Sequence, residues 1–198
     1  MKNFSNTYIV LYLTALVVVI AVVLTLVSTG LKPRRDRNRQ AETYQQILQA
    51  AGHDIDRSKA VAAFSNLADP LTEDGQQYRV ICADGSRGTA IRLDGKGLWG
   101  LIWGYAVVSE DGQTLKGVSF DHKSETPGLG AKITEKAFLK AFEGKKLYDK
   151  DGNFVSVRVL KAGTASEIAE ENRVDAISGA TITSRGVDEM LQGIKSDN

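Results

Sequence analysis

Four hydroxyl side chains lie within seven residues near the C-terminal end of the sequence. They are Ser178, Thr181, Thr183 and Ser184 of the stretch SGATITS, which precedes a short amphipathic segment. Ser178 or Thr183 is placed to cap a helix there, and a phosphate at this point would meet free N–H groups and the helix dipole. No general base lies nearby in the sequence. Thr181 is therefore predicted to be a point of modification rather than a nucleophile in turnover, the alternative being a helix start with surplus hydroxyls.

Two further segments are punctuated by glycine. In GKGLWG (residues 95–100), Trp99 could present its ring face to a planar ligand, although this stretch alone favours a turn followed by a core tryptophan. In HKSETPGLGAK (residues 122–132), a Pro-Gly turn precedes Gly130, where backbone can approach a ligand closely. Glu125 and Thr126 could hydrogen-bond the edges of a ring, while the alternative is an ordinary strand-to-helix loop.

Other chemistries lack the residues that they require. Cys82 is the only cysteine, and the two histidines, His53 and His122, show no ligand spacing, so no metal-ligating residue is assigned. The sequence has no catalytic triad pattern, no G-x-G-x-x-G and no Walker loop, so no catalytic residue is assigned either. Six of the 25 basic residues but one of the 24 acidic residues precede Gln40, which leaves the rest of the chain mildly acidic and argues against nucleic acid as a partner.

The N-terminal part of the chain predicts a membrane anchor. No charged residue lies between Lys2 and Lys32, and the apolar run 8–27 has the length that a helix needs to cross a hydrocarbon core of about 30 Å. A cleaved signal peptide is the alternative, but the run is long for one and no A-x-A site follows. We therefore expect a short flank (1–7), a transmembrane helix (8–31), a basic juxtamembrane stretch (32–40) and one domain (41–198).

Periodicity predicts mixed elements in that domain. Residues 39–54 are expected to form a helix that ends at Gly52. Alternation predicts strands at 77–83, 88–93 and 153–161, and a hairpin of 101–108 with 114–120. Further helices are expected at 132–142, with one face formed by Ile133, Ala137, Phe138 and Ala141, and at 184–195, with one face formed by Val187, Met190, Leu191 and Ile194. These elements predict an α+β fold, with a mixed or antiparallel sheet flanked by helices.

Taken together, the three glycine-punctuated segments resemble a known family. SGAT followed by ITS is similar to the S/T-G-A-T flavinylation motif of the FMN-binding domain of ion-pumping respiratory complexes, and ETPGLG resembles the second signature loop of that domain. GKGLW points to the NqrC family of the Na⁺-translocating NADH:quinone reductase; the sister family, the FMN-binding subunit of the RNF complex, usually lacks KGLW. The resemblance extends over the whole chain, from the N-terminal helix to the last one.

The resemblance implies a cofactor and a set of contacts. FMN would be joined through its phosphate to Thr181 by a separate flavin transferase, which fits the missing base, and the ring would keep its own redox chemistry. The implied contacts at the attachment point are Ser178, Gly179, Ala180 and Thr183. Those implied at the ring are Trp99, Glu125, Thr126, Leu129 and Gly130.

The resemblance also implies a place and partners. The chain would be a single-pass subunit of the bacterial inner membrane that passes electrons within the complex, and its partners would be the other subunits, the transferase and membrane lipid. The family places the flavin domain outside the cytoplasm, whereas the five basic residues after the anchor favour the cytoplasm on a simple charge count. We adopt the family placement, because long domains translocate largely regardless of charge. The alternatives are an RNF-type electron carrier, an anchored FMN-binding or sensor module without covalent flavin, and an independent flavoenzyme.

Overall fold

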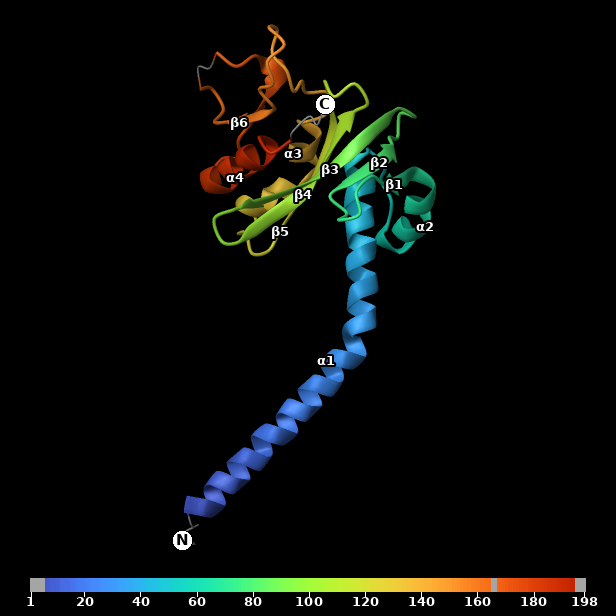
Figure 1. Ribbon diagram of the computed structural model, residues 1–198. Helices are drawn as coiled ribbons and strands as arrows, with labels where there is room; N and C mark the ends of the chain where they lie inside the picture. Colours follow the sequence, from blue (N-terminus) through green and yellow to red (C-terminus); the bar gives the residue numbers. More distant parts are fainter. Residues whose placement is uncertain (1–5, 165–166, 195–198) are drawn as a thin grey trace. The chain divides into compact units, whose positions relative to one another are not determined.

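The computed structural model describes residues 6–164 and 167–194 (Figure 1). The chain divides into two compact units, Met1–Gln40 and Ala41–Asn198. The second unit contains an antiparallel sheet with helices, which confirms the predicted α+β class.

Helix α1 extends over Asn6–Ala50 and contains Pro33. Its N-terminal part is long and apolar enough to cross a membrane, and none of the 18-residue apolar window is buried. The C-terminal end of α1 lies in the second unit, where Ile47, Leu48 and Ala50 are buried. Gly52 follows with a φ of 87°, a left-handed conformation that suits glycine after the end of a helix, as the sequence predicted.

Five strands form an antiparallel sheet in the order β1-β2-β3-β4-β5. Their bounds are Ala68–Pro70, Gln77–Ile81, Arg87–Lys96, Leu101–Ser109 and Leu115–His122. The predicted hairpin is confirmed as β4 and β5. Strand β3 is longer than predicted and pairs with β4 as far as Lys96 opposite Leu101, so residues 97–100 form the loop between these two strands.

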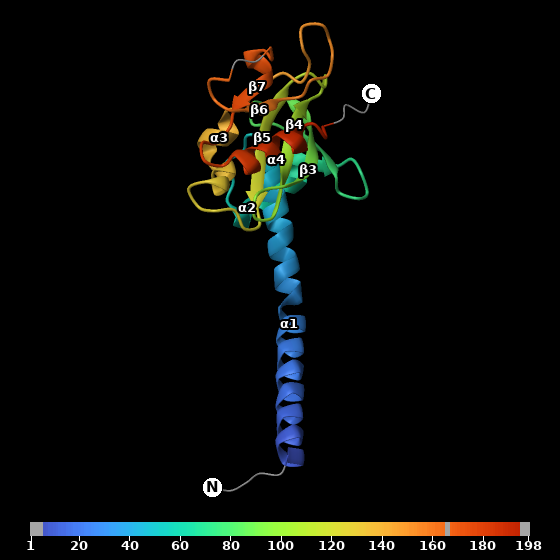
Figure 2. The same ribbon diagram turned by 90° about the vertical axis from the view of Figure 1, so that its left-hand side faces the viewer.

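Both faces of the sheet are covered, because the central strands carry apolar side chains on both sides. On one face, the C-terminal end of α1 and helix α2 (Arg57–Leu67) contribute to a core with Tyr105 and Val107. On the other face, Ile102, Ala106 and Val108 pack with α3 (Lys136–Lys140) and α4 (Thr181–Leu191). Helix α4 crosses this second face and contacts β3 (Figure 2).

Two predicted elements differ from the structure. The expected helix 132–142 is broken at Glu135, which is extended and separates the 3₁₀ helix η1 (Gly130–Thr134) from α3. The break redirects the buried face: Phe138 and Phe142 pack against each other with ring centroids 5.1 Å apart, whereas Ala137 and Ala141 are exposed. The predicted face of this segment is therefore wrong in these two positions.

The expected strand 153–161 is mostly irregular. Only β6 (Arg158–Leu160) is a strand, and it pairs in parallel with β7 (Arg173–Asp175), which follows the 3₁₀ helix η2 (Glu170–Asn172). Ser156 interrupts the segment with a φ of 55°. Its hydroxyl donates a 2.7 Å hydrogen bond to the carbonyl of Leu191, so a contact with α4 replaces strand pairing here.

Candidate flavin site

Helix α4 begins at the motif threonine. Thr181 is its first residue and Ala180 its N-cap, and no side-chain hydrogen bond caps the helix, so the expectation that Ser178 or Thr183 would do so is wrong. The first N–H groups of a helix have no partner inside it. Thr181 is exposed, so its hydroxyl lies at an open helix start where the N–H groups and the dipole favour an anion.

Two of the other three hydroxyls of the stretch point inward. Thr183 and Ser184 are each 1% exposed. The Ser184 hydroxyl accepts a 3.1 Å hydrogen bond from the N–H of Ile177 and so closes the loop that precedes the helix. The Thr183 hydroxyl donates a 2.6 Å hydrogen bond to Oε2 of Glu125. The four hydroxyls therefore divide into two pairs: Ser178 and Thr181 are exposed, whereas Thr183 and Ser184 hold the helix start in place.

Glu125 brings the three segments together. Its side chain is buried, and Oε1 accepts a 2.8 Å hydrogen bond from the backbone N–H of Trp99 while Oε2 accepts from Thr183. Its own N–H donates to Nδ1 of His122 at 3.2 Å. Both carboxylate oxygens thus contact the protein, a role that differs from the predicted contact with a ring edge. The partners lie 26 and 58 residues from Glu125, so no local pattern in the sequence could have revealed them.

Helix α4 lies unusually close to β3 because two glycines face each other. A Cβ on Gly186 would lie 2.1 Å from the carbonyl oxygen of Lys96, and one on Gly95 would lie 2.5 Å from Cγ of Met190. Since real Cβ atoms keep at least 3.0 Å from such neighbours and the Lys96 carbonyl is backbone, glycine is required at position 186 for this approach, whereas a Cβ on Gly95 would displace the Met190 side chain. This close packing fixes α4, which carries Thr181, against β3, the strand that leads to Trp99.

Apolar side chains around the site are exposed. Trp99 is 65% exposed, which excludes the core-tryptophan alternative, and Leu129 is 43% exposed. Leu129 lies against the motif backbone, where a Cβ on Gly179 would be 2.9 Å from its Cδ2. Ile182, which the sequence reasoning did not select, is 53% exposed beside Thr181. Among the predicted contacts, Ser178, Thr126 and Leu129 are exposed, whereas Ala180, Gly130 and Thr183 are buried.

A shallow groove of about 410 Å³ lies beside Trp99. Its lining combines the indole with two cations, and the full set is Lys96, Gly97, Trp99, Gly100, Leu101, Lys123 and Ser124. An exposed aromatic face next to positive charge is suited to a planar ligand that gains negative charge on reduction. The residues present therefore fit a flavin: a helix start suited to a phosphate, an exposed threonine at that start, and an exposed tryptophan whose backbone is joined to the same helix by the two hydrogen bonds of Glu125.

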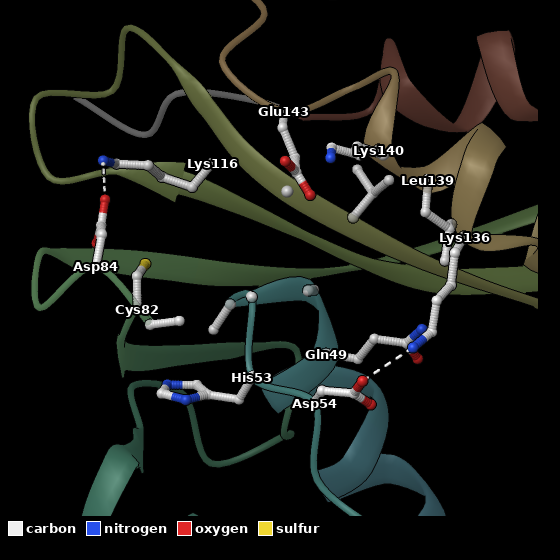
Figure 3. A pocket seen from close by; sticks show the side chains of 16 residues that line it. Gln49, His53, Asp54, Cys82, Asp84, Lys116, Lys136, Leu139, Lys140 and Glu143 are labelled. Atoms are coloured by element: carbon white, nitrogen blue, oxygen red, sulfur yellow. Dashed lines mark hydrogen bonds and ion pairs between the residues drawn. The ribbon is translucent and has the colours of Figure 1, made fainter.

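A second cavity, of about 430 Å³, lies elsewhere in the same unit (Figure 3). It is bordered by the ends of α1 and α3, and ion pairs join Lys116 to Asp84 at 3.1 Å and Lys136 to Asp54 at 2.9 Å. None of its lining residues belongs to the GKGLWG loop, to residues 122–132 or to SGATITS. Within the described ranges, no group of three or more His, Cys, Asp or Glu side chains is placed to hold a metal ion.

Comparison with known proteins decides the family. The sequence profile of the FMN-binding domain matches residues 97–194, which include the GKGLWG loop from Gly97 and both other segments. The NqrC subunit of the Na⁺-translocating NADH-quinone reductase of Vibrio alginolyticus is 34% identical over 149 residues, which cover 74% of this chain and 56% of the relative. The crystal structure of the same subunit from Parabacteroides distasonis is 34% identical, with a TM-score of 0.72 over 82% of this chain and 92% of that one.

The chain belongs to the NqrC family of Na⁺-translocating NADH-quinone reductases. The crystal structure of NqrC from Shewanella oneidensis, 24% identical, shares the fold with a TM-score of 0.62 over 80% of this chain and 91% of that one. The chain spans just over half the length of the curated Vibrio relative that it matches. The NqrC family assignment confirms the resemblance drawn from the three motif segments.

Proposed function

We propose that this chain carries FMN, joined by a phosphoester to Thr181, as the NqrC subunit of a membrane-bound Na⁺-translocating NADH-quinone reductase, and passes electrons within that complex. The observation that carries the proposal is the exposed Thr181 hydroxyl at the uncapped start of an 11-residue helix, inside the region that matches the FMN-binding domain. The names of the relatives support the assignment to the complex.

The chain supplies attachment and placement. In forming the bond, Thr181 loses its hydroxyl proton, its oxygen bonds to the FMN phosphorus of FAD, and AMP leaves, with a separate flavin transferase providing the base. The N–H groups at the start of α4 stabilise the phosphate, and the backbone of Ser178, Gly179 and Ala180 shapes the approach to it. Trp99 and Leu129 would pack against the ring, and Thr126 is also exposed. When bound, FMN supplies reversible electron transfer.

The proposed partners follow from this role. They are the other subunits of the reductase, the transferase, and lipid around the anchor and the basic stretch 32–40, whose cations can reach head-group phosphates. We place the domain 41–198 on the outer face of the bacterial cytoplasmic membrane, following the family. The long apolar start of α1, none of it buried, supports a single membrane crossing at 8–31.

Replacing Thr181 tests the attachment point. We expect Thr181→Ala, produced with the transferase, to lack both the FMN mass and in-gel flavin fluorescence while it melts like the unaltered chain, because the exposed hydroxyl makes no described hydrogen bond. Thr181→Ser should restore attachment. Full fluorescence in Thr181→Ala would refute the assignment. Flavin that washes out of the unaltered protein on denaturation would instead favour an anchored module with loosely bound FMN.

A further inference from the structure

Glu125 is a buried carboxylate whose partners are both neutral donors. It is 5% exposed, and it accepts from the Trp99 N–H at 2.8 Å and from the Thr183 hydroxyl at 2.6 Å. Burying a carboxylate is costly unless hydrogen bonds compensate, and such charge-assisted bonds are about twice as strong as neutral ones. The described structure gives Glu125 no ion pair, so these two hydrogen bonds, from donors held in fixed positions, must offset the cost of burying the carboxylate.

Two motif glycines make room for this carboxylate. A Cβ on Gly97 would lie 2.5 Å from Oε1 of Glu125, and one on Gly130 would lie 2.3 Å from Oε2 and 2.7 Å from Oγ1 of Thr183. Neither glycine has a positive φ, so the backbone conformation does not call for glycine at these positions. The space that the carboxylate needs is the better explanation. Glycines in two of the segments therefore serve the same buried group.

We propose that Glu125 is the positioning residue of the flavin site: its two oxygens hold the backbone at Trp99 and the first turn of α4 in the fixed relation that attachment at Thr181 and ring packing at Trp99 together require. This role rests on the proposed function. It differs from a contact with the ring, because Glu125 acts through Trp99 and Thr183.

The exposure of the neighbouring residues explains why such a group is needed. Trp99 is mostly exposed and lies in the loop between β3 and β4, so packing alone does not fix its place. Across that loop, Gly97 donates to the carbonyl of Gly100, and the bond from Trp99 to Glu125 ties the loop to another segment. Thr183 is two residues after Thr181 in the same helical turn, so its bond fixes the turn that presents the attachment point.

The first arm of the test uses the flavin-free full chain in nanodiscs. The sequence has two tryptophans, so labelling with ¹⁵N-tryptophan gives two backbone amide signals, Trp99 and Trp103. We expect Glu125→Ala to speed hydrogen exchange at the Trp99 amide roughly 10- to 100-fold, since a hydrogen bond to a charged group is lost. Exchange at Trp103, which lies in β4 and pairs with residues of β3 and β5, should not change.

The second arm measures attachment and environment. With FAD and the transferase, we expect Glu125→Ala to acquire the FMN mass at least tenfold more slowly, and the visible circular dichroism of the attached flavin to weaken. Glu125→Gln should recover most of both, because its carbonyl can accept from Trp99 while its amide donates to the Thr183 hydroxyl. Glu135→Gln, an exposed glutamate at the break before α3, is the matched control and should match the unaltered chain.

Each outcome decides between the possibilities. Unchanged exchange at Trp99 in Glu125→Ala, or faster exchange with unchanged attachment rate and circular dichroism, would overturn the positioning role. If Glu125→Ala does not fold, the near-isosteric Thr183→Val removes only one of the two bonds, and it should slow attachment while leaving the Trp99 amide protected; unaltered attachment would overturn the proposal. If the unaltered chain acquires no flavin, the proposed function is refuted. If Glu125→Ala and the unaltered chain acquire flavin equally fast, only the positioning role of Glu125 is refuted.

Discussion

Gly186→Ala is expected to destabilise the domain, although alanine normally favours a helix. Gly186 lies inside α4, where alanine in place of glycine gains about 0.8–1.0 kcal/mol of helix propensity. The new Cβ would lie 2.1 Å from the carbonyl oxygen of Lys96 and 3.1 Å from Cδ1 of Ile102. A clash with backbone cannot be relieved by rotating a side chain, so we take the upper end of the 1–3 kcal/mol range for overpacking, about 3 kcal/mol.

The net expectation is a loss of about 2 kcal/mol in the free energy of unfolding, because the propensity gain offsets roughly 1 of those 3 kcal/mol. For a domain of this size, that loss lowers the Tm by about 4–8 °C. Attachment of FMN should also slow, since α4 must move away from β3 and carries Thr181 with it.

Thermal unfolding of the full chain in detergent, followed by far-ultraviolet circular dichroism, measures the effect. Gly186→Ser should be at least as damaging, and Arg185→Ala, at an adjacent exposed position of α4, should change the Tm little. A Tm of Gly186→Ala equal to or above that of the unaltered chain would show that α4 does not pack on β3 as closely as described, and the reasoning would fail.

Two further predictions concern the ring and the topology. Trp99→Ala should retain covalent FMN but alter the visible spectrum and the redox potential, because an aromatic contact worth on the order of 1 kcal/mol is lost; an unchanged spectrum and potential would mean that the indole does not contact the ring. A cysteine at Glu110, in the exposed turn between β4 and β5, should be labelled by a membrane-impermeant maleimide in intact cells, or in spheroplasts where an outer membrane is present. Labelling only after lysis would place the domain in the cytoplasm.

Two structural details support the choice of Glu110. The neighbouring Asp111 accepts hydrogen bonds from the Ser109 hydroxyl and the Gln113 N–H, so a cysteine there would disturb the turn. The native Cys82 is buried, and desolvation raises the pKa of its thiol. It therefore holds little thiolate near neutral pH and should give little background labelling.

The sequence predicted the elements whose side-chain pattern is long and regular. The N-terminal helix, the β4–β5 hairpin and the buried face of α4 with Val187, Met190 and Leu191 agree with the structure, although α4 ends at Leu191 and the buried Ile194 follows it. Short segments were harder to predict, because tertiary contacts decide them. Phe138 and Phe142 draw a broken helix onto the sheet, and the contact of Ser156 with Leu191 replaces part of a strand.

The candidate site shows the same limit. The motifs located all three segments, and the exposure of Thr181 and Trp99 agrees with the predicted roles. What the sequence could not show is how the segments meet. The bonds of Glu125 join residues far apart in the chain, and the requirement for glycine at Gly186 depends on a backbone carbonyl of another element.

The bond from position 99 to Glu125 uses the main chain rather than the indole. Any residue other than proline can donate that N–H, so the scaffold does not constrain which side chain stands there. Position 99 is consequently free to vary without dismantling the site. A substitution of Trp99 can therefore change the side chain at this exposed surface while the bonds of Glu125 to the N–H of position 99 and to Thr183 remain. The identity of the side chain at position 99 and the assembly of the three segments are separable.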